Sequence, residues 1–165
     1  ECGDKAWILS PPLKGTNGSS SSVGWGTDAN PNPPGYTSPP CSLNFNDGTG
    51  YTGHNWGTAT SIYAFNPGDK AKTVTLSFNS WDDVRADNSV DKRFVELSTD
   101  NFNTVAVSKQ LDNLGTKKMW SFITLDLSAI GPKVFQLRFR FDSVNKQTDP
   151  SRKGWFVEDL NLSSQ

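Results

Sequence analysis

The sequence predicts an all-β fold, an antiparallel sandwich of two sheets. Apolar and polar residues alternate over several short stretches, as in a strand with one buried and one solvated face. Turn-forming residues are frequent, with 14 Gly and 10 Pro among the 165 residues. No stretch keeps apolar residues at the helical spacing i, i+3, i+4, i+7 for three turns. The length suits one domain with a sizeable core.

The first forty residues combine one expected strand with a long loop. Ala6–Leu9 is expected to be a strand. The stretch 11–40 holds most of the prolines and a serine run, so we expect no β-ladder there. We interpret it instead as an ordered Pro/Gly/Ser-rich loop lying on the domain. Trp25 and Tyr36 are the expected anchors of this loop.

Two cysteines, Cys2 and Cys41, flank this loop. An even cysteine count and a composition rich in Ser, Thr, Asn and Gly are typical of an oxidising compartment. A Cys2–Cys41 disulfide would tie the N-terminal arm to the first core strand and contribute about 3–4 kcal/mol in the chain-entropy model. The alternative is two unrelated free thiols. With His54, the only histidine, the cysteines do not supply the four ligands of a structural zinc site.

From Cys41 onward the sequence has a period of two. Thr73–Phe78 and Phe135–Phe141 show the clearest alternation. The other expected strands are Ser42–Asn46, Thr58–Phe65, Arg93–Thr99, Thr104–Lys109, Trp120–Leu127 and Trp155–Leu162. Ser128–Ile130 is expected to form one helical turn. Since no internal repeat or second domain is visible, we expect one domain over residues 1–165, with an arm at 1–40 and a core at 41–165.

Charge and hydropathy exclude several classes of function. The formal net charge is −1 and the basic residues are scattered, so no basic stripe could follow a phosphate backbone and we expect no nucleic-acid partner. No apolar run approaches the roughly 20 residues that span a bilayer, so we expect no membrane insertion. No signal peptide is visible, but a mature secreted chain would lack one.

The order of motifs after Cys41 resembles a known group of modules. CSLNFNDGTGY is followed by GTATSIYAF, TVTLSFNSWDD, RFVELSTDNF, WSFITLDLS, VFQLRFRFDS and GWFVEDLNL. This series is similar to the MAM-like jelly-roll modules of secreted bacterial proteases and surface proteins, and more loosely to carbohydrate-binding jelly rolls. The most specific pieces are VELSTDNF and GWFVEDL, and the resemblance extends over roughly Cys41–Leu162.

The resemblance implies a two-sheet jelly roll. It also implies a non-catalytic role in adhesion, in binding of a glycan or protein, or in support of a neighbouring enzyme domain. Such modules often hold a structural calcium ion. This chain has Glu158, followed by Asp159, where the usual closing motif has an Asp.

Acidic residues gather at the ends of several expected strands. Calcium binds six to eight oxygens, which clustered acids can supply. The candidate metal ligands are Asp47, Asp82, Asp83, Glu158 and Asp159. The alternative is a solvated acidic loop, partly neutralised by Arg85, Lys92 and Arg93. No EF-hand loop is present.

Catalysis by these or other residues is the less favoured interpretation. A glycosidase would need two carboxylates flanking a cleft, and the sequence does not show their separation in space. A Ser–His–Asp triad would have to use His54, but no G-x-S-x-G elbow accompanies it. We therefore expect no enzymatic activity, with a small glycan-active enzyme kept as an alternative.

A glycine-rich stretch, GTGYTGHNWG, is a candidate ligand loop because it holds Tyr51, His54 and Trp56. Aromatic rings stack on the apolar faces of sugars, and Asn and His bond hydroxyl groups. The alternative is a hairpin loop whose rings pack on the edge of the sandwich. Trp25 and Trp56 are expected in loops and are better binding candidates than the tryptophans on expected strands.

Together these features predict an extracellular or cell-surface binding or adhesion module, with bacterial origin favoured. A glycan or a surface protein is the expected partner, bound by end loops through Trp25, Tyr36, Tyr51, His54 and Trp56. The alternative is a structural accessory domain of a larger secreted protease.

Overall fold

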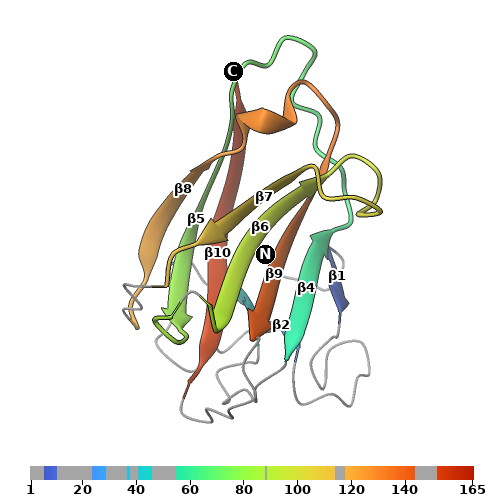
Figure 1. Ribbon diagram of the computed structural model, residues 1–165. Coiled ribbons are helices and arrows are strands. Elements are labelled where there is room, and N and C mark those ends of the chain that lie inside the picture. The colour runs from blue at the N-terminus through green and yellow to red at the C-terminus, as the bar shows by residue number, and fades with distance from the viewer. Residues whose placement is uncertain are drawn as a thin grey trace.

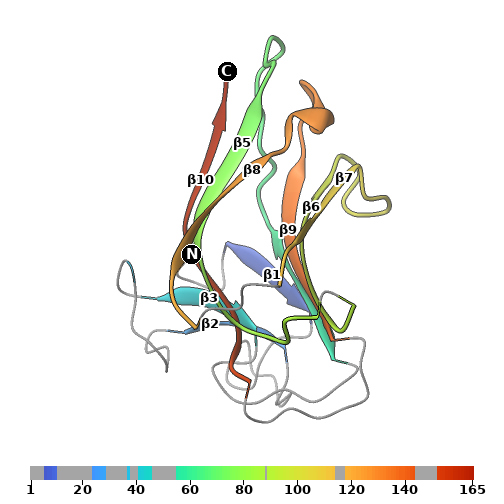
Figure 2. The ribbon, with the colours of Figure 1, turned by 60° about the vertical axis from the view of Figure 1, so that its left-hand side comes forward.

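The computed structural model describes ten strands in two antiparallel five-stranded sheets. The described residues are 6–10, 24–28, 37, 41–45, 55–87, 89–113, 118–143 and 152–165. Sheet A has the strand order β1-β4-β9-β6-β7, and sheet B has the order β2-β3-β10-β5-β8. The two sheets pack against each other as separate layers (Figure 1, Figure 2). This arrangement confirms the predicted two-sheet β-sandwich.

The strand bounds agree with the expected ones to within a few residues, apart from one additional strand, β2. Sheet A contains β1 (Trp7–Ser10), β4 (Trp56–Ser61), β6 (Asp91–Ser98), β7 (Val107–Leu111) and β9 (Gln136–Ser143). Sheet B contains β2 (Trp25–Asp28), β3 (Ser42–Phe45), β5 (Val74–Asp83), β8 (Ser121–Asp126) and β10 (Gly154–Ser164). The expected helical turn is the 3-10 turn η1 (Ser128–Ile130). Among the described residues, no helix is long and apolar enough to span a membrane.

The eight strands from β3 to β10 have jelly-roll topology. They divide into two four-stranded sheets, β3-β10-β5-β8 and β4-β9-β6-β7, and the chain crosses between the sheets after every strand except β6. The expected core segment, residues 41–165, contains all eight strands. β1 and β2, from the N-terminal forty residues, extend the two sheets beside β4 and β3.

The period-two pattern decides which side chains form the core. In β9, Leu137, Phe139 and Phe141 are buried between the sheets, whereas the intervening polar side chains are half-buried on the opposite face. In β5, Val74, Leu76 and Phe78 are buried in the same way, and the residues between them are half-buried. Burying large aliphatic and aromatic side chains in this manner contributes roughly 1.5–3 kcal/mol each.

The prediction that residues 11–40 form no β-ladder is wrong at β2, where Thr27 pairs with Leu43 of β3. The assignment of Trp25 to a ligand-binding loop is also wrong, because its side chain is 0% exposed. Its ring contacts Phe45 and Trp155 in the core, with centroids 5.8 and 5.5 Å apart. The physical reason is the large area of an indole, whose burial outweighs the weak strand propensity of the surrounding glycines.

Neighbouring aromatic residues on β10 are both buried, on opposite sides of sheet B. Trp155 faces the core, where its ring lies 5.5 Å from that of Phe139. Phe156 packs edge-on against Trp81 of β5, with ring centroids 5.3 Å apart. Sheet B is therefore apolar on both faces at this end.

Candidate functional site

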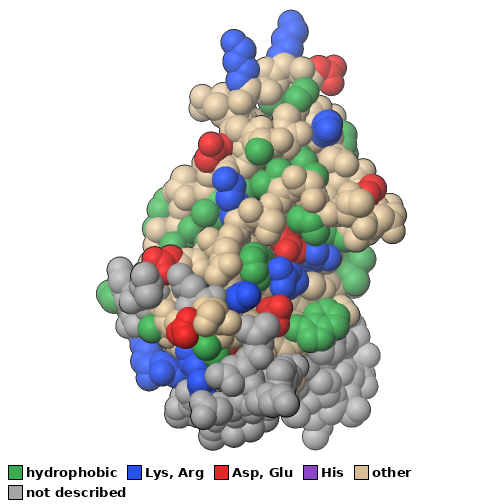
Figure 3. Space-filling model, viewed as in Figure 1, with side chains coloured by type: hydrophobic (Ala, Val, Ile, Leu, Met, Phe, Trp, Pro, Cys, Tyr) green, Lys and Arg blue, Asp and Glu red, His purple; other side chains and the backbone are tan. Residues whose placement is uncertain are grey.

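The outer face of sheet A, which we call face A, carries polar, charged and aromatic side chains in cross-strand rows. They alternate with residues such as Val95 and Phe139, which are buried between the sheets, so they point away from the core. The three rows are Ser108, Glu96, Arg138, Thr60 and Ile8; Gln110, Phe94, Arg140, Thr58 and Ser10; and Lys92, Asp142 and Trp56. Figure 3 shows this side of the molecule, where charged side chains of both signs lie among hydrophobic ones.

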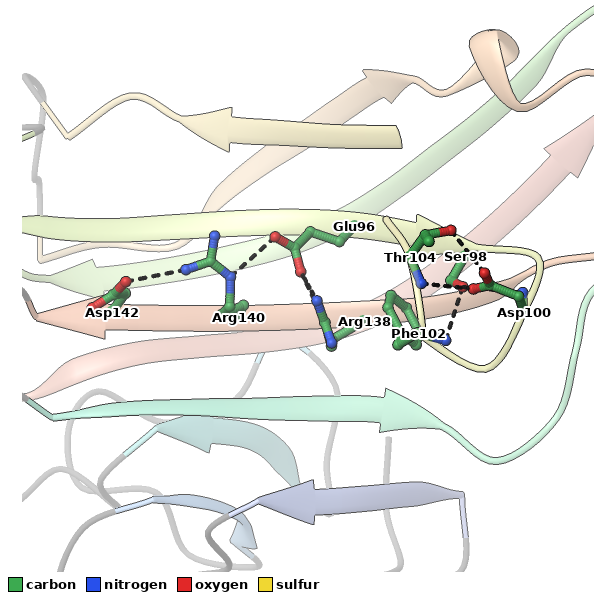
Figure 4. A network of polar contacts seen from close by, with 8 residues as sticks. All are labelled: Glu96, Ser98, Asp100, Phe102, Thr104, Arg138, Arg140 and Asp142. Carbon is green, nitrogen blue, oxygen red and sulfur yellow. Dashed lines mark hydrogen bonds and ion pairs between the residues drawn. The ribbon is translucent and has the colours of Figure 1, made fainter. Parts of the chain in front are cut away.

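Four charged side chains of face A form a continuous ladder of ion pairs (Figure 4). Arg138 Nε donates a hydrogen bond to Glu96 Oε2 at 2.8 Å, and Arg140 Nε donates to Oε1 of the same carboxylate at 3.0 Å. Arg140 Nη1 then donates to Asp142 Oδ2 at 3.1 Å. The Glu96 side chain is only 4% exposed, so its charge is balanced by these two guanidinium groups rather than by water.

Each guanidinium group also stacks on a phenyl ring. Arg140 Cζ lies 3.9 Å from the ring centroid of Phe94, and Arg138 Cζ lies 4.0 Å from that of Phe102. Cation–π contacts of this kind contribute about 0.5–1 kcal/mol at exposed sites. The arginines are therefore held in one orientation, and their remaining N–H groups form a preorganised set of donors on face A.

A tight turn between β6 and β7 holds Phe102 in place. Asn101 and Phe102 have φ values of 58° and 60°, in the left-handed region that non-glycine residues rarely adopt. Asp100 stabilises the turn by accepting hydrogen bonds from the Thr104 backbone N–H at 2.9 Å and from the Ser98 hydroxyl at 2.7 Å. These bonds, with the Thr104 N–H the strongest cause, lower the pKa of Asp100 below its ordinary value.

Trp56 is the exposed aromatic residue in the rows of face A. Its side chain is 58% exposed, whereas the other ring in the rows, Phe94, is half-buried under Arg140. Trp56 is the first residue of β4 and pairs with Asp142 of β9. It is exposed, as a ligand-binding residue must be, but it lies on a strand at the face of the sheet rather than in a loop.

Two of the predicted metal ligands, Asp82 and Asp83, are nearly buried and bonded to cations. Asp82 Oδ1 lies 3.2 Å from Arg93 Nη1, between the sheets. Asp83 pairs with Arg152 at 3.2 Å and with Lys118 at 3.6 Å. These carboxylates therefore do not belong to a solvated loop, and their oxygens already have cationic partners in place of a metal ion.

The other pair of predicted ligands, Glu158 and Asp159, lies around a bulge in β10. Glu158 Oε2 accepts a hydrogen bond from the Thr37 backbone N–H at 2.8 Å. Asp159 has a φ of 53° and accepts a bond from the Asn79 amide at 2.7 Å. Both acids thus accept hydrogen bonds from N–H donors in the described part of the chain.

No metal-binding cluster of acidic, histidine or cysteine side chains occurs among the described residues: they contain no group of three or more His, Cys, Asp or Glu side chains placed to hold a metal ion. The remaining predicted ligand, Asp47, lies outside the described residues, so calcium binding stays a prediction.

Several other predicted residues also lie outside the described part of the chain. Tyr36, Tyr51, His54 and Cys2 belong to this group. Cys41 is buried next to β3, and no free cysteine occurs among the described residues. The pairing of Cys41 with Cys2 stays a prediction.

Sequence reasoning missed most of face A. The residues that it did not single out include Phe94, Glu96, Phe102, Arg138, Arg140 and Asp142, and it named Lys92 only as a cation that could neutralise an acidic loop. A usable signal was present, because Arg138 and Arg140 occupy the polar positions of β9 and Glu96 occupies the matching position of β6. Opposite charges at facing positions of neighbouring strands stabilise a sheet, but only the register shows that these positions face each other.

The sequence matches no protein-family model and no curated protein sequence. Its structure is similar to three solved domains that illustrate the fold. The K1 cleaved adhesin domain of Lys-gingipain from Porphyromonas gingivalis W83 has a TM-score of 0.55 and 14% identity over 96% of this chain and 90% of that one. TmCBM61, solved in complex with beta-1,4-galactotriose, has a TM-score of 0.51 and 11% identity over 96% and 88%.

The third is the glycoside hydrolase domain of Endo-D from Streptococcus pneumoniae R6, with a TM-score of 0.57 and 14% identity. The match covers 88% of this chain but only 20% of that one, so the chain corresponds to about a fifth of that structure. What the chain shares with all three is the β-sandwich fold.

Proposed function

We propose that the protein is a non-catalytic extracellular module that binds glycans through face A. The observation that carries the proposal is the exposed indole of Trp56 beside Asp142 and Lys92. An aromatic ring can stack on the apolar face of a sugar, while fixed polar groups around it bond the hydroxyls. The complex of TmCBM61 with galactotriose supports this use of the fold.

The proposed ligand lies along β4. The outward side chains Thr58 and Thr60 are small and follow Trp56, so they leave room for a ligand between β1 and the arginines of β9. At about 3.3 Å per residue, the strand from Trp56 to Ser61 offers roughly 17 Å for an extended oligosaccharide. The N–H groups of Arg138 and Arg140 not used by the carboxylates are then available to sugar hydroxyls.

The arrangement of carboxylates favours binding over hydrolysis. Glycoside hydrolysis generally needs two carboxyl groups that both reach the scissile bond. Within the described part of face A, Glu96 is almost fully buried against two arginines, and Asp142 is the one carboxylate that is partly exposed. A single, partly exposed carboxylate supports a binding role.

The extracellular location rests on the sequence composition and on the resemblance to MAM-like modules of secreted proteins. A second candidate function is protein adhesion as an accessory domain of a secreted protease, which the likeness to the Lys-gingipain adhesin domain favours. The corresponding surface includes the exposed apolar residues Ile62 and Val134. Together with Gln136 they line a hollow at the end of sheet A opposite to Trp56.

The test is a screen of neutral and charged plant, bacterial and animal glycans, followed by calorimetric titration of the glycans that bind. Trp56→Ala is expected to abolish binding. Phe122→Ala is the matched control, because Phe122 is 68% exposed on the outer face of sheet B. Equal binding by wild type and Trp56→Ala, or loss of binding in the control alone, contradicts the proposal.

A further inference from the structure

The outer faces of the two sheets differ in charge. Face A carries three cations and two anions in its rows, namely Lys92, Arg138 and Arg140 against Glu96 and Asp142. The outer face of sheet B carries Asp126, Glu158 and Asp159, and no cation occurs among its described strand residues. Face A is therefore the electropositive side of a chain whose formal net charge is −1.

The excess charge on face A is located at one residue. Arg138 is bonded to Glu96, and Arg140 bridges Glu96 and Asp142, so the two guanidinium groups and the two carboxylates balance one another. Lys92, which faces Asp142 across the two strands and is half-buried, makes no ion pair with any described residue. Its ammonium group can therefore bind an anion without first breaking an ion pair.

Lys92 lies in the same row as the exposed indole. The row runs from Lys92 on β6 through Asp142 on β9 to Trp56 on β4. Adjacent strands are about 4.8 Å apart, so the Cα atoms of Lys92 and Trp56 are separated by roughly 10 Å. A sugar stacked on the indole can extend its substituents over Asp142 towards the lysine. Asp142, which is held by Arg140, is positioned to accept hydrogen bonds from the sugar hydroxyls.

We propose that the row of Lys92, Asp142 and Trp56 is a subsite for an anionic sugar, in which the Lys92 ammonium pairs with a carboxylate or sulfate group and the indole stacks on the ring. This inference rests on the proposed glycan-binding function and adds the chemical class of the ligand. A charge-assisted hydrogen bond is stronger than a neutral one, so the charge of the sugar contributes directly to affinity.

The experiment compares oligosaccharides that differ only at C6. β-1,4-Galactotriose and cellotriose are each prepared in neutral, C6-oxidised and 6-O-sulfated form and titrated calorimetrically at low and at raised salt. The anionic forms are expected to bind about tenfold more tightly than the neutral form, with the difference decreasing at raised salt. The oxidised and sulfated probes show which of the two anionic groups the subsite accepts.

The Lys92→Gln variant isolates the role of the ammonium group. It is expected to lower affinity for the anionic probe more than affinity for the neutral one, so that the preference for the anionic form is lost. Lys133→Gln, in the exposed connection between η1 and β9, is the matched control and should keep the preference.

The possible failures are distinguishable. Trp56-dependent binding with no preference for charge, or a preference that survives Lys92→Gln, overturns the inference but leaves the proposed function intact. Absence of binding to every probe and to every glycan of the screen overturns both.

Discussion

Arg138 directs two N–H groups, from Nε and Nη2, at a single oxygen of Glu96. The two residues face each other on the neighbouring strands β9 and β6, although 42 positions separate them in the sequence. The other carboxylate oxygen is bonded to Arg140. Glu96 is therefore the centre of the polar ladder on face A, and its removal leaves two guanidinium groups without their shared anion.

Replacing Glu96 by Gln is expected to destabilise the fold by about 2–4 kcal/mol, because charge-assisted hydrogen bonds are lost and a nearly buried site is left with excess positive charge. Urea unfolding followed by circular dichroism measures the effect. Asp142→Asn is the control at the more accessible end of the ladder and should cost less than about 1 kcal/mol. Equal midpoints for wild type and Glu96→Gln would show that the ladder does not stabilise the sheet.

Acid should weaken the turn that positions Phe102. The folded-state pKa of Asp100 is lowered, so the stability that this carboxylate contributes is present above its ordinary pKa of 3.8 and is lost as the pH falls through the lower folded value. Asp100→Asn is therefore expected to lower the urea midpoint at pH 7 and to have a smaller effect in strong acid. Asp69→Asn, at an exposed position, is the control. A pH-independent effect of Asp100→Asn contradicts this account.

Gly57 is a point of close packing between the two sheets. A Cβ atom built there would lie 2.9 Å from the Phe45 ring and 3.0 Å from the Trp25 ring. Gly57→Ala is therefore expected to destabilise the protein by about 1–3 kcal/mol through overpacking. Thr58→Val, one position along on face A, should change stability by no more than about 0.5 kcal/mol. Denaturant midpoints of the two variants test this prediction. An unchanged midpoint for Gly57→Ala would mean that the neighbouring aromatic rings can shift at little cost in stability.

Trp25 and Trp56 should separate stability from binding. Trp25→Ala removes a fully buried indole and is expected to cost about 3–5 kcal/mol. Trp56→Ala removes an exposed one and should change stability by no more than about 1 kcal/mol. Circular dichroism in urea measures both without relying on tryptophan fluorescence. A strongly destabilised Trp56→Ala would indicate that this ring has a structural role.

The contrast between these tryptophans shows what sequence reasoning could predict. Strands such as β5 and β9 were predictable because their alternation is a local property of consecutive residues. β2 was not, because Trp25 is the single large apolar residue among its residues, WGTD, and has a glycine on each side. Its strand state depends on pairing with β3 and on burial of Trp25 in the core.

The candidate site was predictable only in part, for a related reason. Trp56 could be singled out as an aromatic residue in a glycine-rich stretch. Its neighbours Asp142 and Lys92 come from strands far away in the sequence and meet it only through the register of sheet A. Asp83 misled the prediction because its partner Arg152 is 69 positions away in the sequence.

The most direct test of the central claim is to map the bound glycan by nuclear magnetic resonance. The ¹⁵N-labelled protein is titrated with the tightest-binding glycan, and perturbed backbone and indole signals are assigned. Perturbations centred on Trp56, Thr58, Lys92 and Asp142 are the predicted result. Perturbations confined to the outer face of sheet B around Phe122, or to the end loops with face A unaffected, would contradict the claim that face A is the binding surface.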